Sequence, residues 1–441
     1  MARPSMSEVI GSVSARRVWD SRGRPTLEVE INSTSGRSGR AIAPAGASTG
    51  SGEAFDRRDG GPVLGGMDVR DAVAAVNGEI AKSLRGQRID DQMVVDLMLI
   101  DLDGTTNKAR LGGNALIATS MAFAHLRASV AGLPLWRSLA GEGEPILPLP
   151  EIQLFGGGAH ARNQMDIQDY MVVPIGAATF AAALEMTAEV YLAAGKLLDD
   201  AGKRMGVADE GGYWPCFDSN EAGLEMTVRA IEKAGFTPGV DFAISLDIAA
   251  SEFGEAGLYH LQHDNEMLDT SGMIEKLLRW IDRYPIISIE DPLAEDDEAG
   301  LIAFTAAAPP NLQIIGDDYL VTNAARVTRA ALRGACNSAL IKPNQAGTLS
   351  ETHAALRAAR ANGWTTIVSA RSGETEDTTI VHLAVGWAAH QLKVGSFARS
   401  ERMAKWNEGL RIADALDDGR LPPASCFPWG RQSRGAPAAT P

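Results

Sequence analysis

Reactive side chains follow a series of short apolar runs in the C-terminal two-thirds of the chain. The series comprises Asp247 after residues 242–246, Glu290 after 286–289, Asp317 just after 312–315, Lys342 after 339–341, Arg371 just after 365–368 and Lys393 after 391–392. Strands of a (β/α)8 barrel are buried on both faces, and its chemistry lies at their C-terminal ends. The ordered series therefore predicts such a barrel, with an active site built from carboxylates and lysines.

Three of these residues, Asp247, Glu290 and Asp317, are carboxylates on successive predicted strand ends. Converging carboxylates repel one another unless a divalent cation neutralises them, and a ligand set made only of oxygen favours Mg²⁺. Any one of them could instead cap a helix or lie on a surface loop, but the ordered set favours a metal site. Asp291 and Asp318 follow as second acids, and we choose the first acid of each pair because it is nearer to the apolar run.

The two lysines, Lys342 and Lys393, follow later predicted strands. A lysine beside bound Mg²⁺ has its ammonium form disfavoured, so its pKa can fall far enough for it to act as a base. A second lysine can stabilise negative charge that develops on an oxygen of the substrate. Either lysine alone would more often be a salt-bridge partner, but beside three carboxylates the pair favours catalysis.

Two further segments carry polar groups beside flexible backbone. Asp209 and Glu210 precede two glycines, which would bring the backbone close to a ligand, although the segment also fits an ordinary polar turn. Arg371 and Ser372 precede Gly373 and offer a guanidinium and a hydroxyl, which suit a phosphate or a carboxylate. An Arg held in a salt bridge at a simple turn is the alternative for this second segment.

The elements that position these residues divide the chain in two. Residues 8–60 are typical of β structure, with a half-buried strand at 26–31, and residues 68–140 are typical of helices, most clearly 114–131. A Gly/Glu/Pro-rich connector at 141–150 predicts an N-terminal α+β domain over 1–140 and a barrel over 141–429. Residues 430–441 are rich in Gly, Pro, Ser and Ala and predict a disordered tail.

The composition limits the class of protein. The chain has 441 residues, 45% of them hydrophobic, which is enough for a large core. Its net charge of −15 disfavours nucleic acid and membrane surfaces as partners. Three scattered cysteines form neither a disulfide framework nor a thiolate metal site. No signal peptide or transmembrane run is evident, so we expect a cytoplasmic protein.

Several motifs together give the chain a resemblance to the enolase (phosphopyruvate hydratase) family from about residue 8 to 414. They include VWDSRGRPTLEVE, PAGASTG, DEGGYWP, SLDIAASEF, SIEDPLAEDD, LIKPNQAGTLSET, SARSGETEDT and KVGSFARSERMAKWNEGLRI. The resemblance implies an α/β fold with an N-terminal α+β cap over a modified TIM-type (β/α)8 barrel, two Mg²⁺ ions, and a homodimer or higher homo-oligomer. It also implies removal of the α-proton of 2-phosphoglycerate to give an enediolate, followed by loss of the β-hydroxyl to give phosphoenolpyruvate.

The resemblance also implies a role for each matching residue. Lys342 is expected to be the base, Glu210 the acid that helps the hydroxyl to leave, and Lys393 the ligand of the substrate carboxylate and enolate. The remaining expected residues are Asp247, Glu290 and Asp317 for the first Mg²⁺, Ser48 for the second, Arg371 and Ser372 for the phosphate, and His160, Gln168 and Asp169 on the substrate side.

Departures from the family pattern raise the question of the substrate. Ala370 replaces a histidine in the family motif Ser-His-Arg-Ser, and Asp169 stands where the family has Glu. Gly156 and Ala159 change the segment before His160. We therefore predict a specialised relative that acts on a small phosphorylated or phosphono carboxylic acid. Its reaction would form carboxyphosphonoenolpyruvate by phosphonyl transfer, as enolase relatives of phosphonate and phosphinate biosynthesis do. The alternatives are phosphopyruvate hydratase itself and a catalytically silent enolase fold.

Overall fold

The computed structural model describes residues 8–417 and 419–430. The tail predicted to be disordered begins at Gly430 and otherwise lies outside these residues. Among the described residues, no helix combines the length and the apolar character needed to cross a lipid bilayer.

The N-terminal part is built on a three-stranded antiparallel sheet. The strands are β1 (Ile10–Trp19), β2 (Pro25–Ser33) and β3 (Ser38–Ile42), with β2 in the centre. The half-buried strand predicted at 26–31 lies within β2, where Leu27, Val29 and Ile31 are fully buried. They lie at every second position, so they share one face of the sheet, and β2 and β3 both pack against helix α4 (Gly113–Ala131).

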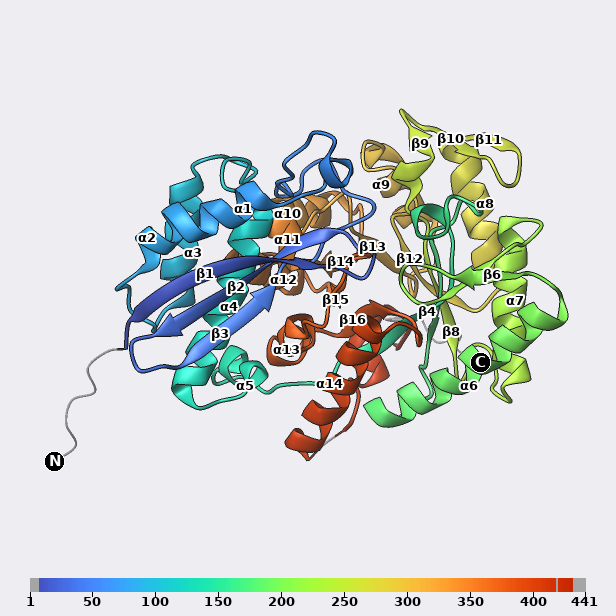
Figure 1. The fold of residues 1–441 in the computed structure, drawn as a ribbon. Helices are drawn as coiled ribbons and strands as arrows, with labels where there is room; N and C mark the ends of the chain where they lie inside the picture. Colours follow the sequence, from blue (N-terminus) through green and yellow to red (C-terminus); the bar gives the residue numbers. More distant parts are fainter. Residues whose placement is uncertain (1–7, 418, 431–441) are drawn as a thin grey trace.

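Helices complete this N-terminal part and connect it to the barrel. They are η1 (Val63–Gly66), α1 (Arg70–Ala75), η2 (Val76–Ile80), α2 (Ala81–Leu84), α3 (Gln92–Asp103), α4 and α5 (Leu135–Ala140). Figure 1 shows the sheet and these helices on one side of the molecule, beside the barrel helices α10 to α12. The N-terminal part therefore forms a cap against one side of the barrel.

The C-terminal part is a closed eight-stranded barrel. Its strands are β4 (Leu149–Gly156), β5 (Asp169–Val173), β8 (Ala243–Asp247), β12 (Ile286–Glu290), β13 (Gln313–Gly316), β14 (Ser338–Ile341), β15 (Thr365–Ser369) and β16 (Gln391–Gly395). Pairing of β16 with β4 closes the barrel. Each of the six apolar runs coincides with one of its strands, so the predicted modified barrel is confirmed.

One strand breaks the parallel order. β5 runs antiparallel to both of its neighbours, β4 and β8. Residues 157–168 join β4 to β5 and contain only the 3-10 turn η3 (Gly158–Ala161), not the helix that usually makes a parallel crossover. The loop brings His160 and the first residue of β5, Asp169, to the same end of the barrel.

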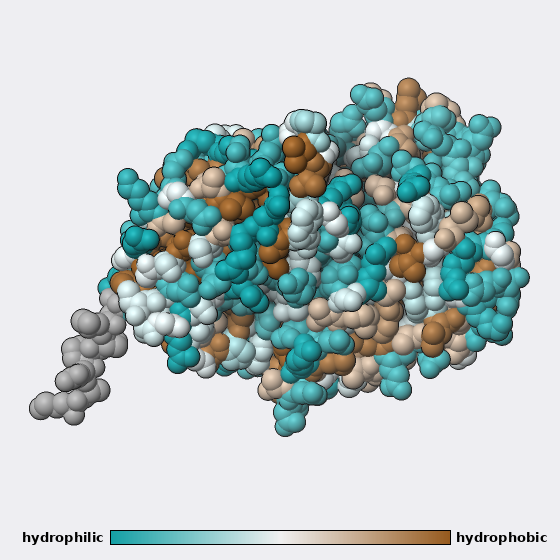
Figure 2. All heavy atoms as spheres, viewed as in Figure 1, coloured by the Kyte–Doolittle hydropathy of each residue, from teal (hydrophilic) through white to brown (hydrophobic). Residues whose placement is uncertain are grey.

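Helices and small hairpins surround the barrel. The helices are α6 (Phe180–Asp200), α7 (Asn220–Lys233), α8 (Thr270–Arg283), α9 (Glu298–Ala307), α10 (Ala324–Arg333), α11 (Pro343–Ala346), α12 (Leu349–Ala361), α13 (Thr379–Gly386) and α14 (Ser400–Leu416). The short elements are β6 (Arg204–Val207), β7 (Tyr213–Pro215), η4 (Ala250–Glu252), β9 (Gly254–Glu255), β10 (Leu258–Leu261), β11 (Glu266–Asp269), η5 (Ala424–Cys426) and η6 (Pro428–Gly430). The face drawn in Figure 2 is mostly hydrophilic, with apolar side chains in small patches.

A hydrogen-bonded polar layer fills part of the barrel interior. Gln313 Nε2 lies 2.7 Å from Gln391 Oε1 and 2.8 Å from Thr365 Oγ1, and Gln313 Oε1 accepts a hydrogen bond from Ser288 at 2.9 Å. These partners come from β12, β15 and β16, so the Gln313 side chain must cross the interior. Gln391 also donates to the fully buried Glu151 at 3.3 Å, which extends the layer to β4. The strand ends above this layer carry the reactive residues.

Candidate active site

The reactive residues converge at the C-terminal ends of the parallel strands. Asp247 ends β8 and Glu290 ends β12, while Asp317 and Lys342 directly follow β13 and β14. Twelve residues line one small cavity at this end: Ser48, His160, Gln168, Asp169, Glu210, Asp247, Lys342, Ser369, Ala370, Arg371, Ser372 and Lys393. The cavity thus contains every predicted site residue except Glu290 and Asp317, which are the partners of its two lysines.

Both lysines are held by carboxylates. Lys393 Nζ lies 2.8 Å from Asp247 Oδ2 and 2.7 Å from Glu290 Oε2. Lys342 Nζ is paired with Asp317 Oδ2. Burial alone would lower the pKa of Lys393, but the charges of Asp247 and Glu290 outweigh burial and hold it well above its ordinary value. A cation that neutralised these carboxylates would weaken this effect and allow the lysine pKa values to fall.

The cluster of carboxylates around the two lysines carries more negative charge than the lysines can balance. Burial, together with the charge of Asp247, raises the pKa of Glu290 well above its ordinary value. Burial and the charge of Asp317 raise the pKa of Asp291 to about 8, and burial and the charge of Asp291 raise that of Asp318 to about 9. Closely spaced buried carboxyl groups of this kind ionise together only when an additional positive charge is present.

The donor set fits a hard divalent cation. Glu290 Oε1 is buried and has no hydrogen-bond partner among the described residues, so one ligand oxygen is free. Carboxylate oxygens of Asp291, Asp317 and Asp318 lie within 4.8 Å of one another. The Asp291 carboxylate accepts from the backbone N–H groups of residues 317 and 318, both at 2.9 Å, and is thereby committed to the backbone. The choice of Glu290 over Asp291 as a ligand remains a prediction.

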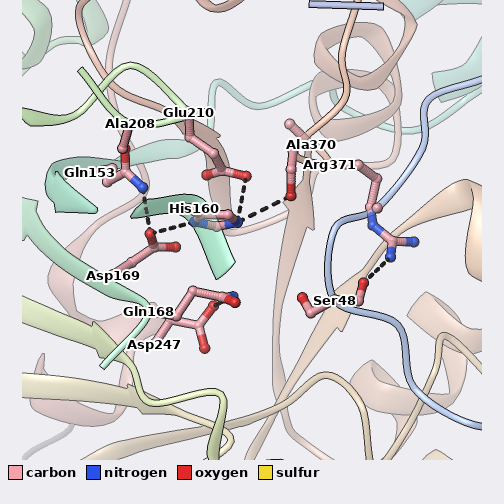
Figure 3. Close-up of polar contacts among 12 residues, drawn as sticks. Ser48, Gln153, His160, Gln168, Asp169, Ala208, Glu210, Asp247, Ala370 and Arg371 are labelled. Atoms are coloured by element: carbon pink, nitrogen blue, oxygen red, sulfur yellow. Dashed lines mark hydrogen bonds and ion pairs between the residues drawn. The ribbon is translucent and has the colours of Figure 1, made fainter. Parts of the chain in front are cut away.

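A second cluster lies beside the lysines and centres on His160 (Figure 3). His160 Nδ1 is 3.1 Å from Asp169 Oδ1, and His160 Nε2 is 3.1 Å from Ser372 Oγ and 3.7 Å from Glu210 Oε1. Burial alone would lower the pKa of His160, but the charges of Asp169 and Glu210 raise it to about 9. His160 is therefore an imidazolium near neutral pH, with both ring nitrogens acting as donors.

Gln168 contacts one of the carboxylates that hold Lys393. Its Nε2 donates to Asp247 Oδ2 at 3.1 Å, the same oxygen that contacts Lys393. Its Oε1 is buried without a partner among the described residues. The amide therefore has one free acceptor in the cavity.

Arg371 joins the barrel to the cap. Its guanidinium pairs with Glu53 at 2.9 Å and donates to the Ser48 carbonyl at 3.0 Å. The backbones of Ala45 and Gly373 exchange hydrogen bonds of 2.9 and 2.8 Å. A Cβ on Gly46 would lie 2.1 Å from Arg371 Nη2, so a glycine there permits this close approach. The Ser48 loop thus lies against the cavity that Arg371 lines.

One polar residue of the site escaped the sequence reasoning. Gln153, within β4, is 1% exposed and donates through Nε2 to Asp169 Oδ1. Its Oε1 accepts from the N–H of Gly212 at 2.8 Å. Gln153 is the fifth residue of β4, a strand that also contains the buried Glu151, so only its polarity at a buried position was a signal.

The comparisons with known proteins cover both parts of the chain. The family model described as "Enolase, N-terminal domain" matches residues 10–139, and "Enolase, C-terminal TIM barrel domain" matches residues 144–421. A protein named Enolase 1, from Desulfitobacterium hafniense (strain Y51), is 47% identical over 422 residues, which are 95% of this chain and 97% of that protein. These matches favour the hydratase alternative over a phosphonyl-transferring specialist. The chain belongs to the enolase family.

Proposed function

We propose that this protein is a phosphopyruvate hydratase, a lyase that converts 2-phosphoglycerate to phosphoenolpyruvate. The observation that carries the proposal is the single cavity lined by both lysines, Glu210, His160 and the Arg371–Ser372 pair. Such a cavity would give one small ligand a basic group, an acid and anion-binding groups. The relative named Enolase 1 supports the same reaction.

The chain's own residues account for each part of this reaction. Lys342 takes the α-proton once its pairing with Asp317 is weakened, and Lys393 faces the substrate carboxylate, where negative charge grows in the enolate. Glu210, on the opposite side of His160 from Asp169, gives a proton to the departing β-hydroxyl. Arg371 and Ser372 offer a guanidinium and a hydroxyl to the phosphate.

Asp247, Glu290 and Asp317 are the proposed holders of a first Mg²⁺, and Ser48 contributes to a second when substrate is bound. Their oxygens, including the unpartnered Glu290 Oε1, form the kind of donor set that Mg²⁺ prefers. Bound Mg²⁺ supplies positive charge that stabilises the substrate's carboxylate as the enolate forms.

A specific observation keeps the carboxyphosphonoenolpyruvate-forming reaction as a second candidate. Ala370 lines the cavity, is 5% exposed, and presents only a methyl group beside Arg371 and Ser372. Where the family has an imidazole, the cavity therefore has space and one donor fewer. A larger transferred group on that side would use this space.

A parallel assay of the two reactions tests the proposal. The purified protein is given Mg²⁺ with 2-phosphoglycerate alone, or with a three-carbon phosphorylated acid and an activated phosphonoformate donor, and both products are followed by ³¹P NMR. We expect phosphoenolpyruvate from the first mixture and no carboxyphosphonoenolpyruvate from the second. The reverse pattern would reject the hydratase and support the second candidate.

A further inference from the structure

The Gln153 side chain occupies a fixed place between two parts of the site. It is almost fully buried, and its amide makes one contact at each end: Nε2 to Asp169 Oδ1, and Oε1 to the N–H of Gly212 at 2.8 Å. A carboxylate only accepts and a backbone N–H only donates, so the orientation of the amide is determined by its partners. A flipped amide would lose both contacts.

Each contact leads to a residue of the proposed chemistry. Asp169 Oδ1 is also 3.1 Å from His160 Nδ1, so the Gln153 amide and the imidazole share one carboxylate oxygen. Gly212 ends the turn that carries Glu210, and its carbonyl accepts from the N–H of Ala208 at 2.8 Å. One side chain on β4 thereby connects the residue that orients His160 with the turn that presents Glu210 (Figure 3).

Two glycines make room for this amide. A Cβ on Gly212 would lie 2.4 Å from Gln153 Oε1, and a Cβ on Gly156 would lie 3.2 Å from Nε2 and 2.6 Å from the Ala208 methyl. Neither position accepts a larger residue without moving the amide or the turn. Gly156 is one of the departures from the family pattern, and this packing gives it a physical reason.

We propose that Gln153 is a positioning residue, which fixes the position of the Asp169 carboxylate relative to the turn that carries Glu210. Asp169 is one methylene shorter than the family's glutamate, and the long Gln153 side chain reaches the retracted carboxylate. The expected kinetic effects rest on the proposed function. The contact between Gln153 and the turn does not depend on that function.

The test varies the length of the two side chains. Gln153→Asn withdraws the amide by about 1.5 Å, one C–C bond, and should lower kcat for 2-phosphoglycerate by about 100-fold with a much smaller change in KM. Adding Asp169→Glu advances the carboxylate by the same length. The double variant should therefore regain about tenfold in kcat, while the Gly212 contact stays broken.

Gln92→Asn is the matched control, because Gln92 Nε2 also donates to a carboxylate, Asp96 Oδ1 at 3.1 Å, but in the cap. It should change the melting temperature without changing kcat. A Gln153→Asn enzyme within twofold of the wild-type kcat, or a double variant no faster than Gln153→Asn, would overturn the proposal.

Amide hydrogen exchange separates this proposal from the proposed function. Exchange at the Gly212 N–H should be about tenfold faster in Gln153→Asn than in wild type, because the amide loses its acceptor. If the wild-type protein does not turn over 2-phosphoglycerate, the proposed function fails and this exchange rate alone decides the inference. Unchanged exchange at Gly212 would then overturn it.

Discussion

Two positions, His160 and Ala370, show how single residues determine the charge and the hydrogen-bond donors of this site. Ala370 contributes no donor, whereas His160 is buried between Asp169 and Glu210, whose charges raise its pKa to about 9. The remaining imidazole is therefore positively charged near neutral pH and donates to Ser372.

Ala370 occupies the position of the missing ring. Ala370→His should raise kcat for dehydration of 2-phosphoglycerate by about tenfold, since a donor aimed at developing charge can contribute about 10²–10³ and a newly placed ring recovers only part of it. Steady-state kinetics measure the change, and Ala389→His, a buried alanine outside the cavity, controls for added bulk. A fall in kcat with unchanged folding would show that dehydration needs the space beside Arg371, and would contradict this prediction.

Lys342 is the proposed base. Lys342→Ala should lower kcat by about 10³ or more, because general base catalysis contributes about 10²–10⁴ and the variant offers no replacement. The stabilisation of the fold by Mg²⁺ should persist. Lys276→Ala is the control, since this buried lysine pairs with Asp264 and Glu266 outside the cavity. Substantial activity in Lys342→Ala would remove Lys342 from the proposed role.

At the scale of elements, the positions of the strands could be predicted from the sequence, but the direction of one strand, β5, could not. The runs 242–246, 286–289 and 339–341 are apolar enough to reveal buried strands. The antiparallel course of β5 goes with residues 157–168, which form no crossover helix and which sequence patterning did not distinguish from another βα connection. Gln153 was missed because its role depends on Asp169 and Gly212, which only folding brings to it.

The polar layer inside the barrel gives a prediction at this scale. Gln313→Leu should lower the free energy of unfolding by about 2–4 kcal/mol, because buried groups of Ser288, Thr365 and Gln391 lose their partner. Urea unfolding followed by circular dichroism measures it. Leu332→Gln, at a position that is 81% exposed, should leave stability nearly unchanged. Equal stability of Gln313→Leu and wild type would show that the layer adds nothing to the fold.

At the scale of the whole molecule, two parts of the chain complete one cavity. The cap supplies the Ser48 loop, and the barrel supplies the carboxylates, both lysines and Arg371. Motifs in the sequence identified these residues. The sequence did not reveal that Lys393 pairs with both Asp247 and Glu290, or that Arg371 pairs with Glu53 of the cap, because such partners are set by packing.

The excess of buried carboxylates predicts a metal-dependent fold stability. Mg²⁺ at 100 times its dissociation constant should stabilise the protein by about 2.7 kcal/mol and raise its melting temperature by a few degrees. Scanning calorimetry with KCl at matched ionic strength measures the shift. Glu290→Gln should abolish it, whereas Glu232→Gln, at an exposed position, should not. No shift in the wild-type protein would favour a catalytically silent fold.

The most direct test of the central claim is the release of deuterium from C2 of [2-²H]2-phosphoglycerate into water. Removal of this hydron by a base is the step for which the lysines, Glu210 and the carboxylates are arranged. We expect the wild-type protein to release the deuterium only with Mg²⁺, and Lys342→Ala to release none. Retention of the deuterium by wild-type protein that binds both Mg²⁺ and 2-phosphoglycerate would contradict it.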